Sequence, residues 1–248
     1  MTERRLDQPL AEESPVALVL NGKRLSTFMC TPQALDELAV GHLKSRGLIE
    51  NRESIKRLLV CPDRGSIYVD AFVHNDASED EGIIASSCGS GIRAVELLGC
   101  VNRLPVDSSW IIALSKLRDW SKHMFAEAEL YRSTGGVHCA ALRGEDGFYS
   151  MREDVGRHNA VDKIIGRGIF DGLDFSQTAL LTSGRIAADM VLKAWAVGIP
   201  VLASRSIPTT SAYELALTAR IALIGRIGTA NAIIYSSRDR IKTDSISG

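Results

Sequence analysis

Residues 179–203 read ALLTSGRIAADMVLKAWAVGIPVLA, and this stretch decides the fold class. The apolar run 179–182 predicts a buried strand, and the run 199–203 predicts a second one. Between them, 186–196 has the length and composition of a helix, and Gly198 is placed to end it. A strand, a helix of about a dozen residues and another strand, in this order, indicate a layered α/β architecture.

The same alternation continues on both sides of this unit and extends the α/β pattern from residue 110 onward. The expected elements are a helix over 114–131, a hairpin of strands 137–143 and 148–152, a helix that starts near Gly156 with Asp154 as its N-cap, a helix over 211–219 with a Ser211–Glu214 capping box, and a strand over 230–235. No internal repeat or low-complexity tract interrupts this pattern.

Strand patterns dominate the first third of the chain. We expect strands over 16–20, 23–29, 56–61, 66–73 and 83–85, and one helix that starts at Thr31-Pro32 and ends at Gly47. The region 99–109 lacks periodicity and contains Pro105, so it is the expected connector. The sequence therefore predicts a smaller β-rich N-terminal region over 1–104 and an α/β domain over 105–248.

Composition and charge exclude several classes of protein. The 29 Lys and Arg residues nearly balance 30 Asp and Glu residues, which argues against a nucleic-acid partner. With 45% hydrophobic and 24% charged residues, the chain matches an average globular protein rather than a disordered or coiled-coil one. The N-terminus is charged, and the longest uncharged apolar stretch, 194–204, is about half the length that spans a bilayer. We therefore expect a cytoplasmic protein with no membrane segment.

Cys88 is the residue best placed for chemistry. Five cysteines are an odd number at low density, which indicates a reducing compartment and makes an accessible thiol more interesting chemically than structurally. Cys88 follows the predicted strand 83–85, with glycines at 89 and 91. A thiol of ordinary pKa, about 8.5, is mostly protonated at pH 7, so nucleophilic work requires a positive group such as Arg93, a histidine or a helix N-terminus. The alternative interpretation is a small buried residue at the end of a strand.

The other four cysteines lie in or beside apolar runs, and we expect them to be buried free thiols: Cys30, Cys61, Cys100 and Cys139. The chain contains no C-x-x-C pair and no H-x-E with P-C-x-x-C pattern. These spacings argue against a structural metal and against zinc-dependent deamination.

The stretch 153–163 reads EDVGRHNAVDK and places six ionisable groups around the start of a helix. Arg157 and His158 fall in the first turn, where the helix dipole favours anions rather than cations. Cations in the first turn go against this preference, and such an exception inside a polar cluster indicates a functional site. The alternative is a capped and solvated helix start.

Two turns from strand to helix can build a crevice. Ser183, Gly184 and Arg185 follow the first strand of the opening unit, and their N–H groups with the guanidinium suit a phosphate or carboxylate. The turn SRSIPTT, at 204–210, follows the second strand. Turns on the same edge of an open α/β sheet form the usual position of a ligand.

Taken together, these motifs are those of one family. The stretches that carry the resemblance are TGGVH at 134–138, EDVGRHNAVDK at 153–163, SGR at 183–185, Asp189-Met-Val with Lys193, GIP at 198–200, and PT at 208–209. Over nearly its whole length the chain resembles the FdhD family, the formate dehydrogenase accessory sulfurtransferases. The resemblance implies a three-layer, cytidine-deaminase-like α/β domain with a mixed sheet and no zinc site, a smaller N-terminal region, and a homodimer.

The resemblance also implies a function. Such a protein takes sulfur from a cysteine desulfurase as a persulfide, here on Cys88. It then passes the sulfur to the molybdenum bis(molybdopterin guanine dinucleotide) cofactor before that cofactor is inserted into formate dehydrogenase. The residues implied to contact the cofactor are Arg226, Ile227, Gly228, Thr229, Ala230 and Asn231, with Ser183, Gly184, Arg185, Arg157 and His158.

The sequence departs from the family pattern in two places. Gly91 stands where the family carries a second cysteine, and 226–231 lacks the family's usual phenylalanine and further arginine. A cofactor-binding maturation chaperone that transfers no sulfur is therefore an alternative. A weaker third hypothesis is a hydrolase that modifies nucleotides.

Overall fold

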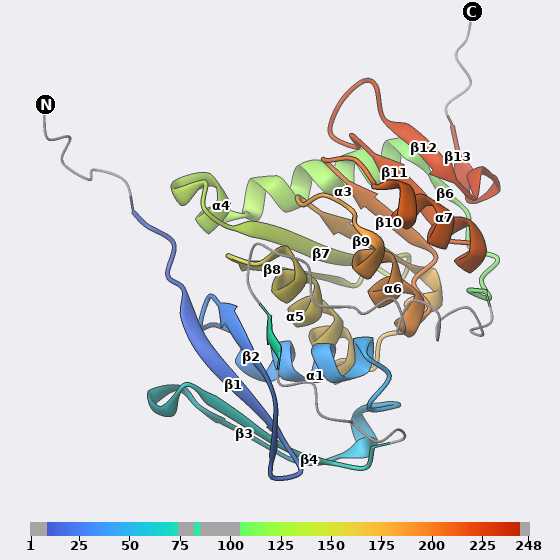
Figure 1. Ribbon diagram of the computed structural model, residues 1–248. Helices are drawn as coiled ribbons and strands as arrows, with labels where there is room; N and C mark the ends of the chain where they lie inside the picture. Colours follow the sequence, from blue (N-terminus) through green and yellow to red (C-terminus); the bar gives the residue numbers. More distant parts are fainter. Residues whose placement is uncertain (1–8, 74–81, 85–104, 244–248) are drawn as a thin grey trace, which may run out of the picture.

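The computed structural model of the chain describes residues 9–73, 82–84 and 105–243. Cys88 and Cys100 lie outside these ranges, as does the loop 86–91 that the sequence analysis singled out. Within the described ranges, two main sheets carry the fold, one from the N-terminal third and one from the rest of the chain (Figure 1).

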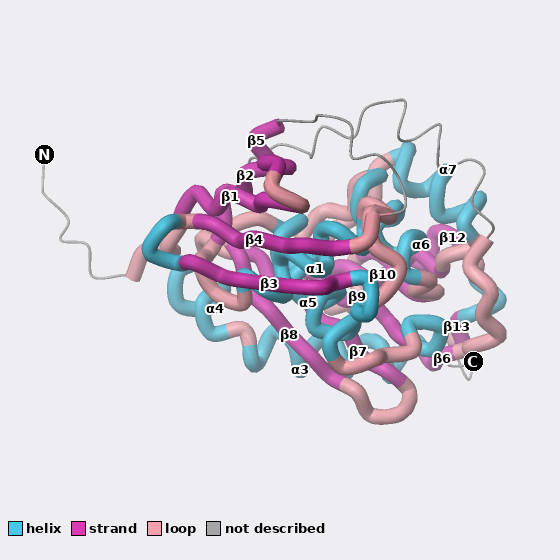
Figure 2. Tube along the Cα trace, turned by 90° about the horizontal axis from the view of Figure 1, so that it is seen from below, coloured by secondary structure: helices cyan, strands magenta, loops and turns pink. Residues whose placement is uncertain are grey.

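The N-terminal sheet has five strands in the order β3-β4-β1-β2-β5. Its strands are β1 (Ser14–Leu20), β2 (Lys23–Cys30), β3 (Ile55–Cys61), β4 (Ser66–Ala71) and β5 (Gly82–Ile84). As predicted, β1 and β2 form a hairpin over Asn21 and Gly22, which both have positive φ, as a tight hairpin turn requires. The helix α1 (Leu35–Ser45) shares one apolar core with this sheet, and Figure 2 shows β3 and β4 side by side across it.

The second sheet has six strands in the order β12-β11-β10-β9-β7-β8. Its strands are β7 (His138–Gly144), β8 (Tyr149–Asp154), β9 (Thr178–Thr182), β10 (Val201–Ser204), β11 (Ala222–Gly225) and β12 (Ile233–Ser236). The three central strands β9, β10 and β11 are parallel, while β7, β8 and β12 run antiparallel to their neighbours. This mixed sheet confirms the expected α/β class. The likeness to cytidine deaminases and the division at residue 104 stay predictions.

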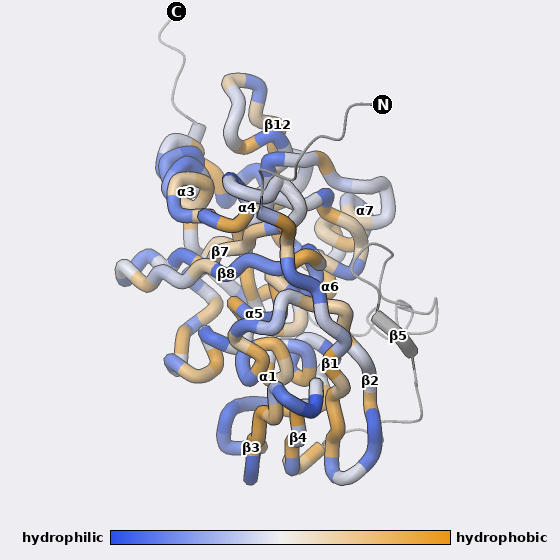
Figure 3. The backbone as a smooth tube through the Cα atoms, turned by 90° about the vertical axis from the view of Figure 1, so that its left-hand side faces the viewer, coloured by the Kyte–Doolittle hydropathy of each residue, from blue (hydrophilic) through white to orange (hydrophobic). Residues whose placement is uncertain are grey.

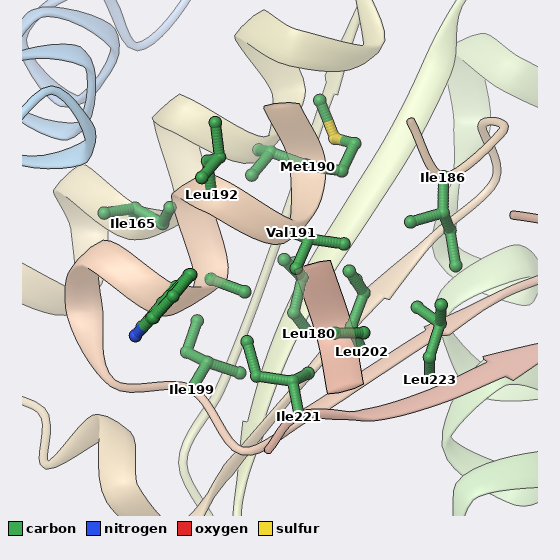
Figure 4. Packing of buried hydrophobic residues seen from close by; sticks show 14 of the residues in the cluster. Ile165, Leu180, Ile186, Met190, Val191, Leu192, Ile199, Leu202, Ile221 and Leu223 are labelled. Carbon is green, nitrogen blue, oxygen red and sulfur yellow. The ribbon is translucent and has the colours of Figure 1, made fainter. Parts of the chain in front are cut away.

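Helices cover both faces of the six-stranded sheet (Figure 1). One face carries α5 (Arg157–Phe170), α6 (Ala188–Val197) and α7 (Thr210–Ala219); the other carries α3 (Leu114–Glu127) and α4 (Glu129–Thr134). A two-stranded pair, β6 (Ile112–Ala113) with β13 (Ile241–Lys242), packs with the second group. Figure 4 shows Leu180, Leu202 and Leu223, one from each parallel strand, in one apolar cluster with Val191 of α6.

The helices α1 and α5 join the two sheets through direct contact of their backbones. A Cβ atom on Gly41 would lie 1.8 Å from the Asp162 carbonyl oxygen, and one on Gly166 would lie 1.9 Å from the Glu37 carbonyl oxygen. Only glycine permits this approach. Arg152 of β8 adds a bidentate ion pair to the Glu37 carboxylate, with both N–O distances 2.6 Å.

Along the chain, Figure 3 shows apolar stretches on α1 and β4, which belong to the same core.

One predicted helix start, that of α1, and one predicted N-cap, Asp154 for α5, are wrong because tertiary contacts use the capping side chains. α1 begins at Leu35 rather than after Thr31, since the buried Thr31 hydroxyl accepts a hydrogen bond from the Val155 N–H (3.2 Å). α5 has Gly156 as its N-cap, while the Asp154 carboxylate is paired with Lys163.

Other boundaries differ for local reasons. The expected helix 114–131 breaks at Ala128, because the Glu153 carboxylate accepts the N–H groups of Leu130 and Tyr131 and so starts a second helix. The N-cap of α7 is Thr209, whose hydroxyl accepts from the Ala212 N–H (3.3 Å), so the Ser211 capping box is wrong. The α6 helix begins at 188 instead of the expected 186, and β12 begins at 233 instead of the expected 230. Strand β11 was not predicted at all.

Candidate functional site

The carboxyl ends of β9 and β10 lie side by side because the two strands are parallel. Two hydrogen bonds join their turns: the Ser204 hydroxyl donates to the Gly184 carbonyl (2.6 Å), and the Arg205 N–H donates to the Thr182 carbonyl (3.2 Å). Within the first turn, the Gly184 N–H donates to the Thr182 hydroxyl (3.2 Å). The prediction that both turns share one edge of the sheet is therefore confirmed.

Strand β11 adds a third turn to the same edge. The Ile227 N–H donates to the Ser204 carbonyl (3.0 Å), and the Arg226 N–H donates to the Ser206 carbonyl (2.9 Å). Arg226 has a φ of 55°, a left-handed conformation that costs a non-glycine residue about 1 kcal/mol. The Ile227 side chain is buried in the core, whereas Arg226 is exposed. The turn is thus anchored by an apolar side chain and presents a cation to the edge.

An exposed arginine follows each of the three parallel strands: Arg185, Arg205 and Arg226. Neighbouring strands lie about 4.8 Å apart, so the three turns span an edge about 10 Å wide. The Arg205 guanidinium lies over the Phe125 ring of α3, 5.2 Å from its centre. The sequence analysis places Arg205 in the turn 204–210 but, unlike Arg185 and Arg226, does not count it among the expected cofactor contacts.

The rest of the predicted contact stretch continues from Arg226. Gly228, Thr229, Ala230 and Asn231 are all exposed, and Arg118 of α3 donates to the Ala230 carbonyl (3.2 Å). The structure therefore brings 226–231 and 183–185 to one edge of the sheet. Ile227 differs from these neighbours, because the whole residue is only 1% exposed and its N–H donates to the Ser204 carbonyl.

The start of β7 reaches the same edge, since β7 runs antiparallel to β9. There, the Nδ1 atom of His138 lies 3.2 Å from the Ser183 hydroxyl oxygen, which also accepts the Cys139 N–H (3.1 Å). Burial, and then the positive charges of Arg157 and His158, lower the pKa of His138 below its ordinary value. His138 is therefore neutral at pH 7.

Arg157 and His158 stand at the start of α5, directly against the first turn. A Cβ atom on Gly184 would lie 3.0 Å from the Cβ and Cδ atoms of Arg157, so the arginine stem packs on the bare glycine. The Nε2 atom of His158 faces the carboxylate of Asp189 on α6. Burial opposes ionisation of Asp189, but the hydrogen bond with His158, the charges of His158 and Lys193 and the Met190 N–H together outweigh it and lower the pKa of that carboxyl.

A fully buried ion pair fastens the N-terminal sheet to this site. The Lys163 ammonium lies 2.6 Å from the Asp154 carboxylate, and both side chains are 0% exposed. The same carboxylate accepts the Thr31 N–H (3.2 Å) and the Asn159 side chain (3.0 Å), while Lys163 donates to the Thr31 carbonyl (2.9 Å). The residue that follows β2 is thereby held against the start of α5.

A second buried network is centred on Asp162, one helical turn after His158 on α5. The Asp162 carboxylate accepts from Lys193 of α6 (2.6 Å) and from the Ser45 hydroxyl of α1 (3.0 Å), and it lies 3.3 Å from His42 Nδ1. Burial opposes ionisation of Asp162, but Lys193 and His42 outweigh it and lower its pKa to about 2. The sequence analysis gives His42 no role and uses Lys193 only as part of a family motif, because their common partner Asp162 lies on another helix.

Two of the three described cysteines, Cys30 and Cys139, are poor candidates for thiol chemistry. Burial, with a smaller contribution from the Asp154 carboxylate, raises the pKa of Cys30 to about 12, and burial raises that of Cys139 to about 12. Cys61 is partly exposed, which corrects its expected burial. Cys88, the predicted catalytic residue, lies outside the described residues, but β5 four residues before it pairs in parallel with β2.

Two general features of the described residues bear on cofactors and location. Among them, no three His, Cys, Asp or Glu side chains group closely enough to hold a metal ion. None of the helices that the structure describes is long and apolar enough to cross a membrane.

Comparison with known proteins identifies the family. The model of the FdhD/NarQ family matches residues 11–242. The chain belongs to the FdhD/NarQ family. It is 30% identical to the sulfur carrier protein FdhD of Bacillus subtilis, with 96% of this chain and 92% of that protein aligned. It is 34% identical to the protein of the same name from Methanothermobacter thermautotrophicus, over 96% of this chain and 93% of that one.

A crystal structure of a family relative has the same fold. The chain described as a formate dehydrogenase accessory protein from Desulfotalea psychrophila superposes with a TM-score of 0.75 at 27% identity, covering 94% of this chain and 90% of that chain. The FdhD/NarQ resemblance read from the motifs is therefore confirmed, and the mixed α/β fold is one that a relative also adopts.

Proposed function

We propose that this protein is a sulfur carrier needed for formate dehydrogenase activity. It takes sulfur from a cysteine desulfurase and transfers it to the molybdenum bis(molybdopterin guanine dinucleotide) cofactor. Membership of the FdhD/NarQ family over 11–242, with relatives named as sulfur carrier proteins, is the observation that carries the proposal. The family resemblance further leads us to propose a cytoplasmic homodimer.

Cys88 is the proposed carrier thiol. Its thiolate attacks the outer sulfur of the desulfurase persulfide, so that one S–S bond forms, another breaks, and the desulfurase thiolate leaves without net oxidation. Cys88 comes four positions after Ile84, and an extended chain of that length spans about 14 Å at most. Ile84 pairs with Phe28 of β2, and the end of β2 is fastened to the start of α5. This connection supports a role for Cys88 at the crevice.

The row of arginines is the proposed cradle for the cofactor. Each guanidinium can form two parallel hydrogen bonds to a phosphate, and Arg185, Arg205 and Arg226 lie on one edge. The exposed backbone at Gly228 allows a ligand to approach closely, because a Cβ atom there would meet nothing within 4 Å. A protein with almost no net charge can thus bind a polyanionic cofactor, because these three arginines gather positive charge at one edge.

In the second transfer the Cys88 thiolate is the leaving group. The outer sulfur of the persulfide is formally neutral, so it becomes a sulfido ligand only when two electrons reach it. We propose that the cofactor arrives with reduced molybdenum(IV), which supplies both electrons and ends as molybdenum(VI). The cofactor is the cargo of this reaction, and the protein supplies the thiolate and the docking surface.

The second candidate is a maturation chaperone that binds the cofactor and transfers no sulfur. Gly91, in place of the family's second cysteine, favours it, because no neighbouring thiol at that position can release sulfur from Cys88. The two functions differ in one chemical outcome, which is whether the protein gains sulfur.

Intact-mass measurement tests the proposal. The purified protein is incubated with a cysteine desulfurase and cysteine, and the mass of one added sulfur atom is sought. We expect wild type and Cys61→Ala to gain it and Cys88→Ala not to, with Cys61→Ala as the control because Cys61 is the partly exposed thiol. A Cys88→Ala protein that still gains one sulfur, or a wild type that gains none, contradicts the carrier function.

A further inference from the structure

The start of α5 is buried and lacks a cap. Its N-cap residue, Gly156, has no side chain to accept a hydrogen bond. Within the ranges that the structure describes, the N–H groups of Arg157, His158 and Asn159 have no acceptor, although these residues are only 8%, 3% and 2% exposed. A helix end that is buried without partners for its first N–H groups is unusual, because each unsatisfied donor costs free energy.

The two backbone N–H groups just before the helix, in contrast, both have acceptors. The Gly156 N–H donates to the Asp154 carboxylate (2.8 Å), and the Val155 N–H donates to the Thr31 hydroxyl (3.2 Å). The unsatisfied donors therefore begin sharply at the first helical residue.

Two side chains add donors at the same place. Arg157 Nε and His158 Nδ1 are both buried, and neither has a hydrogen-bond partner in the described part of the chain. The opposite ring nitrogen of His158 faces Asp189, so Nδ1 lies on the ring edge that this carboxylate does not use. Arg157 is held against Gly184, and both cations are near enough to His138 to lower its pKa.

The charges at this helix start also require a counter-charge. The positive end of the dipole of a 14-residue helix coincides with a guanidinium and an imidazole. Asp189 balances one ring nitrogen of His158, while the five unused N–H positions carry partial or full positive charge. An anion is the ligand that satisfies all of them at once.

We propose that the start of α5 is a binding site for one anionic group, held by the N–H groups of 157–159, Arg157 Nε and His158 Nδ1. In this site Nδ1 of His158 faces the anion, while Nε2 faces Asp189. The identity of the physiological anion rests on the proposed function. It is either a phosphate of the cofactor or the sulfur anion of a persulfide, since both accept several N–H donors.

Bromide locates the site without an activity assay. Crystals of the full chain are soaked in bromide, and anomalous scattering is used to place the ions. We expect a peak within hydrogen-bonding distance of His158 Nδ1 and the N–H of residue 158. Bromide found only beside exposed arginines such as Arg185, or nowhere on the protein, overturns the proposal.

Calorimetric titration distinguishes the two sources. Inorganic phosphate is the probe in one arm and anaerobic hydrosulfide in the other. We expect His158→Gln and Arg157→Lys to weaken the binding of at least one probe about tenfold or more, because each removes a charge-assisted hydrogen bond. The control is His123→Gln, which alters an exposed histidine on α3 paired with Glu127. Unchanged binding of both probes in both variants contradicts the site.

The outcomes separate this site from the carrier function. A protein that gains sulfur at Cys88 but binds neither probe keeps the proposed function and loses the anion site. A protein that binds phosphate through 157–159 but gains no sulfur keeps the anion site and favours the chaperone.

Discussion

Replacing Lys163 by methionine removes one partner of the buried pair that fastens β2 to α5. The Lys163 ammonium and the Asp154 carboxylate are 2.6 Å apart and fully buried, so the variant leaves a carboxylate without its counter-ion. Breaking such a pair costs about 3–5 kcal/mol, a large part of a typical total stability of about 5–15 kcal/mol. The carboxylate keeps three N–H donors, from Gly156, Asn159 and Thr31, and these place the expected cost near the lower end of that range.

The pH dependence gives a second signature. Burial already raises the pKa of Asp154 above its ordinary value despite Lys163, and loss of Lys163 raises that pKa further. A carboxyl whose folded pKa exceeds its unfolded value binds its proton more tightly in the folded state, so stability falls as pH rises between the two values. Lys163→Met should therefore lose less stability at pH 5 than at pH 8.

Urea unfolding, followed by the fluorescence of the three tryptophans, measures both effects. The double variant Asp154→Asn/Lys163→Met is the matched control, because it removes the uncompensated charge and should recover part of the loss. A loss below about 1 kcal/mol that is equal at both pH values would refute the assigned role of the pair.

Three further outcomes follow from the same geometry. Gly166→Ala should lower the free energy of unfolding in urea by about 3 kcal/mol or more, because its Cβ would lie 1.9 Å from the Glu37 carbonyl oxygen. The control Gly228→Ala, where a Cβ meets nothing within 4 Å, should lower it by less than about 0.5 kcal/mol. Equal losses would contradict the close packing of α1 on α5. Arg226→Gly should leave stability unchanged or higher, because residue 226 has a φ of 55°, yet weaken the binding of guanosine diphosphate about tenfold in calorimetry; unchanged affinity would remove Arg226 from the cradle. Asp162, with a pKa of about 2 against an ordinary 3.8, should contribute about 2 kcal/mol to the free energy of unfolding, a contribution that is present above pH 4 and lost as pH falls toward 2. The stability of Asp162→Asn should not show this loss in acid. If the variant and the wild type lose stability identically in acid, the carboxylate does not stabilise the fold.

The local parts of the fold and site could be predicted from the sequence because short-range signals determine them. The unit 179–203 contains its own strand patterns and its own helix stop at Gly198, and both are confirmed. The sharing of one edge by the turns at 183–185 and 204–210 follows from the parallel order of β9 and β10. The motif at 153–163 shows a polar helix start in the sequence alone, and α5 begins there at Arg157.

Long-range polar contacts could not be predicted in the same way. Thr31 has the composition of an N-cap, but Asp154 and Val155, more than 120 residues later, capture it. Ala128 lies in a continuous helical pattern that is broken by the Glu153 carboxylate on another element. Gly41 looks like an ordinary helix glycine until α5 is placed against it. Such features depend on residues that only the folded chain brings together.

The most direct test of the sulfur-carrier function is the restoration of formate dehydrogenase activity in cells that lack their own FdhD protein. We expect the wild-type chain to restore activity and Cys88→Ala to restore none. Gly91→Cys, which rebuilds the family's second cysteine, should restore at least as much activity as wild type. Full restoration by Cys88→Ala would contradict sulfur transfer through this thiol and leave the cofactor-binding chaperone as the function.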